Sequence, residues 1–212
     1  MRLAARRSIL AVAAAATAVA TTVAASPGAS AAPIWTLHYT AKVSTYVKKP
    51  GKTVNFTGTQ TTMVDIGALK NNVSAALSLK PGTMTVDLPL IPGLVTIPGI
   101  ATATLQIEPT GPAKGNFDSG NIDVTQYFNV QVTKLTPPVL SFVNLVPDTC
   151  KTATPASMHL TGKITNIFSP FSMHTTYTLP SFANCGLLTG VITSLTSGSG
   201  NTVTATFTPA AG

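Results

Sequence analysis

Two cysteines are the residues of this 212-residue chain with the clearest chemistry. Neither Cys150 nor Cys185 has a histidine at the spacing of a metal site, and the chain contains no third cysteine. Two cysteines in an exported chain predict a disulfide bond between them. Closing a loop of this length stabilises a fold by roughly 3 to 4 kcal/mol in the chain-entropy model. A reactive or metal-binding thiol is the alternative interpretation.

The other residues capable of chemistry form no catalytic set that the sequence reveals. His38, His159 and His174 stand in alternating, strand-like segments, where a histidine is usually a surface residue or a hydrogen-bonding partner. The chain has six acidic residues and no Gly-x-Ser-x-Gly nucleophile turn. We therefore expect no enzymatic activity and no cofactor.

Residues 115–123 are the densest acidic segment and the weak candidate for an ion site. Asp118 and Asp123 lie among the Asn, Gly and Ser residues typical of a calcium loop. The spacing of such a loop and its closing glutamate are missing. We predict a hairpin turn here, since Asn, Asp and Gly accept a positive φ angle.

The first 31 residues have the composition of an export signal. Arg2, Arg6 and Arg7 precede an uncharged apolar run over residues 9–20, and an A-x-A cleavage site follows at 29–31. The run is shorter than the roughly 20 residues of a membrane-spanning helix. We expect residues 1–31 to be removed. Residues 32–212 are then a single secreted domain, extracellular or in the cell envelope, without a transmembrane span.

Residues 32–212 carry little charge. Three of the 13 basic residues lie in the leader, which leaves ten lysines against six acidic residues and a net charge of +4. The lysines are scattered, apart from Lys48, Lys49 and Lys52, and they lack the interleaved aromatic residues of a nucleic-acid surface. Nucleic acid is therefore not an expected partner. The lysine cluster is interpreted as a solvated turn, with contact to anionic lipid or wall polymer as the alternative.

Apolar and polar residues alternate with a period of two through most of this domain, which predicts β-strands. The longest predicted strand runs from Trp35 to Val47, and Pro50-Gly51 ends it. Further strands are expected within residues 54–66, 73–79, 84–90, 101–107, 122–132, 158–164, 171–179 and 202–208, with a turn cluster at 109–120. This pattern predicts an all-β fold, an antiparallel β-sandwich or barrel-like domain.

One segment departs from the strand period. Leu187, Leu188, Val191, Ile192 and Leu195 recur at helical spacing, and a glycine at 198 supplies a stop signal. We expect one short C-terminal helix over residues 186–197, packed on the sheet through its apolar side.

Two uncharged apolar stretches, residues 88–105 and 139–146, have two interpretations. Prolines and glycines in the first stretch exclude a membrane-spanning helix. One interpretation is a pair of buried strands joined by a Pro-Gly connection. The other is an exposed edge of a groove that binds a lipid or another hydrophobic partner. The candidate contact residues are Leu90, Leu94, Ile97, Ile100, Leu140 and Phe142.

The C-terminal third contains a set of short motifs. They are Asp148-Thr149-Cys150-Lys151-Thr152, Leu160-Thr161-Gly162, Tyr177-Thr178-Leu179-Pro180-Ser181-Phe182, Cys185-Gly186-Leu187-Leu188-Thr189 and Gly200-Asn201-Thr202-Val203-Thr204. This segment, about residues 148–209, resembles a group of exported all-β proteins of actinomycete-type bacteria with no established activity. Before residue 148 the similarity is only compositional. The resemblance implies a cysteine pair, a secreted location and a β-fold, and it supplies no catalytic residues.

These observations favour an exported, non-enzymatic protein of the envelope or the extracellular space that binds a lipid, a cell-wall component or another hydrophobic ligand. A structural or adhesive surface protein without a defined ligand is the alternative. A hydrolase of unknown class is the third hypothesis.

Overall fold

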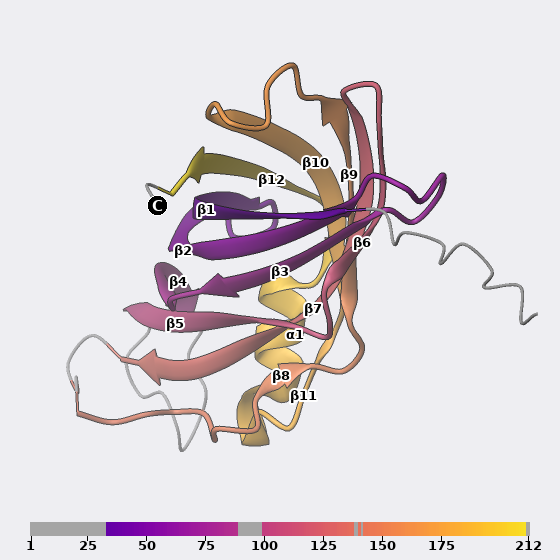
Figure 1. Cartoon of the computed structure of the whole chain (residues 1–212). Coiled ribbons are helices and arrows are strands. Elements are labelled where there is room, and N and C mark those ends of the chain that lie inside the picture. The colour runs from indigo at the N-terminus through magenta and orange to yellow at the C-terminus, as the bar shows by residue number, and fades with distance from the viewer. Residues whose placement is uncertain (1–32, 89–98, 138–139, 141, 211–212) are drawn as a thin grey trace, which may run out of the picture. The chain divides into compact units, whose positions relative to one another are not determined.

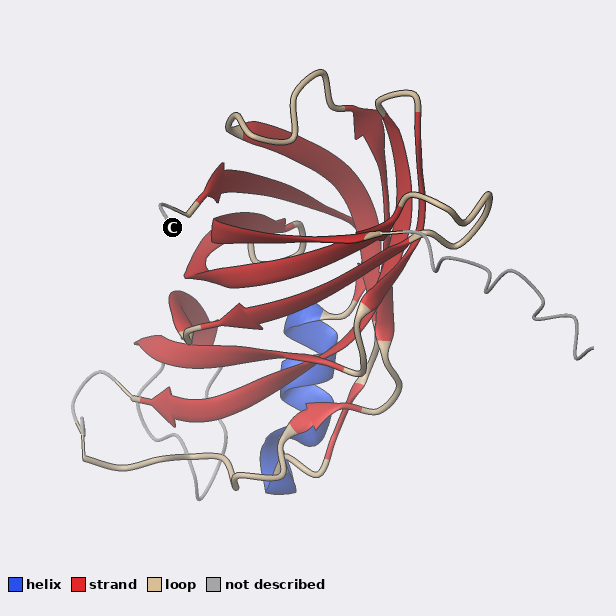
Figure 2. Cartoon of the chain, viewed as in Figure 1, coloured by secondary structure: helices blue, strands red, loops and turns tan. Residues whose placement is uncertain are grey.

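The computed structural model describes residues 33–88, 99–137, 140 and 142–210 (Figure 1). Within these residues the strands form one 12-stranded sheet in which every pairing is antiparallel. A short helix accompanies them near the C-terminus (Figure 2). The all-β class and the C-terminal helix predicted from the sequence are confirmed.

The elements follow one another along the chain. They are β1 (Ile34–Val47), β2 (Lys52–Asp65), β3 (Val73–Leu79), β4 (Gly82–Leu88), β5 (Gly99–Pro109), β6 (Ala113–Asp118), β7 (Asn121–Thr136), β8 (Lys151–Thr152), β9 (Ala156–Lys163), β10 (Phe171–Leu179), β11 (Phe182–Ala183), the 3-10 helix η1 (Gly186–Leu188), α1 (Thr189–Thr196) and β12 (Gly198–Pro209).

The sheet has the order β10-β12-β1-β2-β3-β6-β7-β5-β4. The last strand, β12, lies between β1 and β10, so residues from the two ends of the described chain are neighbours, as in the pair Val43 and Ala205. The long strand β7 pairs with β6 and β5 along one edge and with β9 and β8 along the other. β9 also approaches β10 (Figure 1), but no ladder joins these two strands in the described part, and the hydrogen-bonded sheet is not closed.

The alternating sequence pattern corresponds to the two faces of the sheet. In β1, Tyr39, Ala41 and Val43 are buried, whereas His38 and Thr40 are exposed. Buried residues from the other strands meet them and form one continuous core. The inward face of the curved sheet is therefore apolar, because successive side chains of a strand point to opposite sides.

The acidic segment forms the predicted hairpin turn. Ser119 and Gly120 connect β6 to β7 with φ angles of 50° and 82°. Two successive positive φ angles match the twist of a two-residue hairpin. The predicted turn cluster at 109–120 was too long, because it contains β6. Gly115 and the exposed polar residues of β6 weaken its alternating pattern, and its pairing with β3 and β7 forms the strand.

A disulfide bond and the helix close one end of the sheet. Cys150 and Cys185 are joined by an S–S bond of 2.05 Å, which confirms the predicted pairing. Leu188 and Ile192 are buried, whereas Leu187, expected on the same apolar side, is 85% exposed. The reason is that Leu187 belongs to the tighter 3-10 turn before α1, where helical spacing does not apply.

Candidate functional site

Inward-facing side chains of the sheet surround a cavity of about 80 Å³, which we call the larger cavity. This volume is several times the roughly 10 to 15 Å³ that one water molecule requires. Its walls come from β1, β2, β3, β5, β6, β7, β9, β10 and β12 and from the loop between β9 and β10. Most of the lining residues are aliphatic or aromatic, as are Leu37, Val64, Phe117, Met158 and Phe207.

The polar side chains that line the larger cavity are bonded to the protein itself. Gln126 is 3% exposed, and its Nε2 atom donates to the carbonyl oxygens of Gly111, at 2.9 Å, and Tyr127, at 2.6 Å. The Tyr39 hydroxyl donates to the carbonyl oxygen of Ile167 at 2.8 Å. These groups are already satisfied, so they do not attract a polar ligand.

The other polar side chains of the lining are also hydrogen-bonded within the protein. Gln60 Nε2 donates to Thr62 Oγ1 at 2.9 Å. No buried side-chain nitrogen or oxygen atom of the described residues lacks a hydrogen-bond partner. The lining residues of the larger cavity also include no charged side chain within the described ranges. An apolar ligand fits such a cavity, because burying an unpaired charge or polar group here would cost free energy.

An aromatic cluster forms one wall of the larger cavity. The ring centroids of Tyr39 and Phe171 are 5.5 Å apart in an edge-to-face arrangement, and those of Phe171 and Phe207 are 5.3 Å apart. Burial raises the pKa of Tyr39 above its ordinary value of 10.0. The three rings join β1, β10 and β12, strands that are distant in sequence, and present an apolar surface to the cavity.

A second, smaller cavity of about 50 Å³ lies between the sheet and the C-terminal helix. Met84 and Leu88 of β4 line it from the sheet, and Ile192 and Leu195 of α1 line it from the helix. The helix therefore has a definite role in the site: its apolar side covers this part of the interior.

Four residues line both cavities and therefore lie at the boundary between them: Thr45, Phe56, Ile107 and Tyr177. Tyr177 and Thr45 share a hydrogen bond of 2.8 Å between their side-chain oxygens. The Tyr177 ring packs edge-on against Phe128, with centroids 5.8 Å apart. We call this set of four residues the partition.

The hydroxyl groups of the partition form a short chain. Thr45 Oγ1 donates to the carbonyl oxygen of Thr202 at 3.0 Å, so its lone pairs accept the proton of the Tyr177 hydroxyl. Burial raises the pKa of Tyr177 above its ordinary 10.0, and the hydrogen bond to Thr45 acts in the opposite direction. Tyr177 is therefore neutral over the physiological pH range.

The predicted contact residues are only partly within the described structure. Leu90, Leu94 and Ile97 lie outside the described residues, and Ile100 occupies a position in β5 opposite Asp87. In the stretch 88–105, β4 ends at Leu88, β5 begins at Gly99, and the two strands pair antiparallel. This pairing agrees with the buried-strand interpretation. Leu88, Ala103 and Leu105 of this stretch line the smaller cavity.

The second stretch has no such role. Leu140 is exposed and Phe142 is 83% exposed, and neither lines either cavity. The described residues of 139–146 form no strand; Val146 is buried in the core, and the partly buried Leu145 packs against it. The two predicted stretches therefore do not meet around one groove in the described part of the chain.

The ion-site candidates do not converge on a ligand set. Asp118 accepts a hydrogen bond from Ser119 at 2.9 Å, whereas Asp123 pairs with His159 at 2.7 Å. Both members of the second pair are 60% exposed, and neither lines a cavity. Over the described ranges, no group of three or more histidine, cysteine or acidic residues has the arrangement of a metal site.

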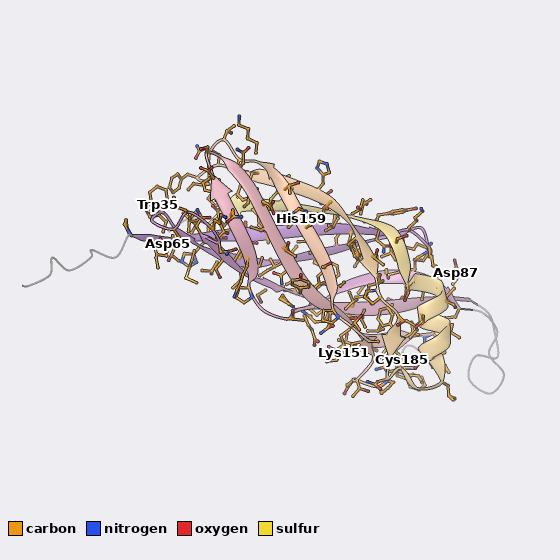
Figure 3. All side chains as sticks on the ribbon, turned by 90° about the vertical axis from the view of Figure 1, so that its right-hand side faces the viewer. Trp35, Asp65, Asp87, Lys151, His159 and Cys185 are labelled. Atoms are coloured by element: carbon orange, nitrogen blue, oxygen red, sulfur yellow. A yellow bond between two sulfur atoms is a disulfide. The ribbon has the colours of Figure 1, made fainter. Side chains whose placement is uncertain are left out.

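The other two histidines are surface residues. His38 is exposed on β1 and lies 3.2 Å from Thr61 Oγ1, while His174 is exposed on β10 opposite Thr204. Figure 3 shows His159 on the outside of the strands, between the end that carries Trp35 and the end that carries Cys185.

The positions of the two cavities and of the partition were not predicted from the sequence. The available signal was the presence of hydroxyl and amide side chains on the buried side of alternating strands, as with Thr45, Thr62, Gln126 and Tyr177. Such residues interrupt an otherwise apolar face and indicate a specific interior arrangement.

No helix among the described residues has the length and apolar character to span a membrane. Comparisons with protein-family models, curated proteins and solved structures found no match for this chain.

Proposed function

We propose that this protein is an exported, non-enzymatic binding protein that holds an apolar molecule, such as the hydrocarbon part of a lipid, inside its curved sheet. The leader-like first 31 residues and the disulfide support the exported location.

The observation that carries the proposal is the chemistry of the larger cavity. Its polar side chains are bonded to the protein, its lining lacks charge in the described residues, and its volume exceeds that of a single water several times. Apolar cavities of this kind stay dry and take up apolar guests. A ligand that replaces empty space with van der Waals contacts gains free energy without breaking an existing hydrogen bond.

One end of the sheet is suited to receive such a ligand. The turn between β2 and β3 and the loop between β9 and β10 expose large apolar side chains there. Leu69 is 97% exposed, and Ile66, Phe168 and Trp35 are also exposed. Exposed apolar groups gathered at one place are typical of surfaces that meet lipid or a hydrophobic partner. We call this region the loop end.

Native mass spectrometry of the purified secreted protein tests the proposal. We expect an added mass that disappears on denaturation, together with an N-terminus near Ala32. The apo protein should also bind the fluorescent apolar probe N-phenylnaphthylamine. A clean apo mass combined with no probe binding contradicts the proposal.

A matched pair of variants places the binding in the cavity. Ala205 of β12 lines the larger cavity, so Ala205→Phe fills it, whereas Thr204→Phe adds the same ring on the exposed face of the same strand. We expect Ala205→Phe to reduce probe binding at least about tenfold, because its ring occupies the cavity, and Thr204→Phe to leave probe binding unchanged. The added ring in the core costs about 1–3 kcal/mol of stability, which a stable fold tolerates. Equal binding by both variants means that the probe binds elsewhere.

A second candidate function rests on the outer face of the sheet. Thr59, Thr40 and Thr208 are exposed and directly opposite one another on β2, β1 and β12. Such a row of hydroxyl groups suits hydrogen bonding to a cell-wall polysaccharide. Co-sedimentation with insoluble wall polymer tests this adhesive function: Thr40→Glu should abolish binding, and unchanged sedimentation contradicts the function.

A further inference from the structure

We propose that the partition sets the length of apolar chain that the protein accepts, with Tyr177 as the residue that determines the limit. This inference rests on the proposed function. It specifies the ligand as a straight apolar chain and names the residue that limits the length of that chain. Among the described residues, the four side chains of the partition are those that line both cavities.

The geometry of the two cavities supports this inference. The larger one reaches toward the loop end through Leu37, Val64 and Ile164, and the smaller one reaches the helix through Leu179 and Ile192. Since the same four side chains line both, the cavities lie on the two sides of one wall. A chain that grows within the larger cavity therefore meets the partition before it meets the helix.

Two neighbouring side chains hold Tyr177 in place. Its hydroxyl is fixed by the 2.8 Å hydrogen bond to Thr45, and its ring rests edge-on against Phe128. A chain end that pushed the ring aside would break a buried hydrogen bond and leave a polar group unpaired. The wall is thus stable against a short ligand, and a longer ligand must open it.

The volumes of the two cavities relate ligand length to affinity. The larger cavity provides room for several water-sized groups, and the smaller one adds more than half as much again on the far side of the partition. Each methylene buried in an apolar cavity raises affinity about fourfold. Affinity should therefore rise with chain length until the chain reaches Tyr177 and then stop rising.

The experiment uses straight-chain alcohols from hexanol to hexadecanol as competitors of N-phenylnaphthylamine. For the unaltered protein we expect an affinity gain of about fourfold per methylene, followed by a plateau. Tyr177→Ala joins the two cavities and should move the plateau to longer chains by at least two methylenes, about a sixteenfold gain for those alcohols. Tyr177→Phe keeps the ring but loses its hydrogen bond to Thr45, so it should move the plateau less than Tyr177→Ala does.

A second variant keeps the test decisive if Tyr177→Ala does not fold. Ile107 belongs to the partition and is only half-buried, so Ile107→Ala opens the wall at a smaller cost in stability. It too should move the plateau to longer chains. Val64→Ala, on the wall of the larger cavity toward the loop end, is the matched control and should not move it.

The outcomes separate the two proposals. If the unaltered protein binds neither the probe nor any alcohol, the proposed function fails. If it binds them but shows no plateau, or if the plateau stays in place in both Tyr177→Ala and Ile107→Ala, the binding function stands and the partition inference is overturned.

Discussion

The two ends of the sheet differ in how they are closed. At the helix end, Cys150, Cys185 and Leu188 are fully buried, and Asn201 fixes the β1–β2 turn by accepting from the backbone N–H of Lys48 at 3.0 Å. At the loop end, by contrast, large apolar side chains are exposed on turns. Figure 3 shows Trp35 and Asp65 at one end of the strands and Cys185, with the helix, toward the other.

This difference shows how one sheet can be stable and still leave room inside. The helix end combines a covalent bond, fully buried side chains and satisfied polar groups, and so contributes stability. The loop end leaves apolar groups in water, which an isolated stable fold does not require. We therefore expect substitutions of buried residues at the helix end to change stability and substitutions of exposed residues at the loop end to have little effect on it.

Removal of the disulfide should have the largest effect. A Cys150→Ala, Cys185→Ala double variant should lose about 3–4 kcal/mol of unfolding free energy, because the unfolded chain regains the entropy of an open loop. Urea unfolding followed by circular dichroism measures this loss. The unaltered protein treated with a reductant is the control and should lose a similar amount; an unchanged midpoint in both would show that the helix end does not depend on the bond.

Two neighbouring leucines sharpen the comparison within the helix end. Leu188 is fully buried, so Leu188→Ala should cost about 3 kcal/mol, within the range for large-to-small substitutions in a core. Leu187→Ala, at the adjacent exposed position, should change the unfolding free energy by less than about 0.5 kcal/mol. Equal effects in urea unfolding would contradict the buried position of Leu188.

Tyr177 lies between the two ends, and its substitution should have a moderate, pH-dependent effect on the unfolding free energy. Tyr177→Phe removes the hydrogen bond to Thr45 and should cost about 1 kcal/mol at neutral pH. Because burial raises its pKa in the folded state, Tyr177 contributes full stability below the unfolded value near 10.0, and that contribution falls as the pH rises above it.

The pH dependence has its own measurement. Unfolding free energies of the unaltered protein and of Tyr177→Phe are compared at about pH 8 and about pH 11. The unaltered protein should lose more stability between these values than the variant does. Tyr39 also has a raised pKa and is present in both proteins, so a common decline is expected and only the difference reports on Tyr177. Parallel declines would contradict its burial as a neutral hydroxyl.

The smallest effect is expected at the loop end. Leu69→Ser replaces the most exposed of the large apolar side chains described and should change the unfolding free energy by less than about 0.5 kcal/mol. A loss of more than about 1 kcal/mol would show that Leu69 packs against the fold and that the two ends do not differ as described.

Much of the strand layout could be predicted from the sequence. The alternation in 35–47 and 73–79 corresponds to β1 and β3, and the Asp, Asn and Gly residues around Gly120 form the hairpin. These are local properties, because a strand face and a turn depend on neighbouring residues. β6 was missed, since Gly115 and exposed polar residues weaken its alternating pattern and its pairing with β3 is a long-range property.

The candidate site shows the opposite balance. Apolar runs without charge were interpreted as the edge of a groove, yet Phe142 lies exposed on a loop, and the cavity walls come from alternate residues of most strands. Hydrophobicity along the chain measures the tendency to leave water. It does not show which buried side chains pack fully and which leave space between them.

The sequence by itself determined the all-β class, the short C-terminal helix and the pairing of the two cysteines. The first two follow from local periodicity, and two cysteines can pair within the chain in only one way. The tertiary structure alone decided that β12 lies between β1 and β10 and that Tyr177 meets Thr45. Contacts between residues 132 positions apart depend on the order and curvature of all the strands between them, and no local pattern encodes that geometry.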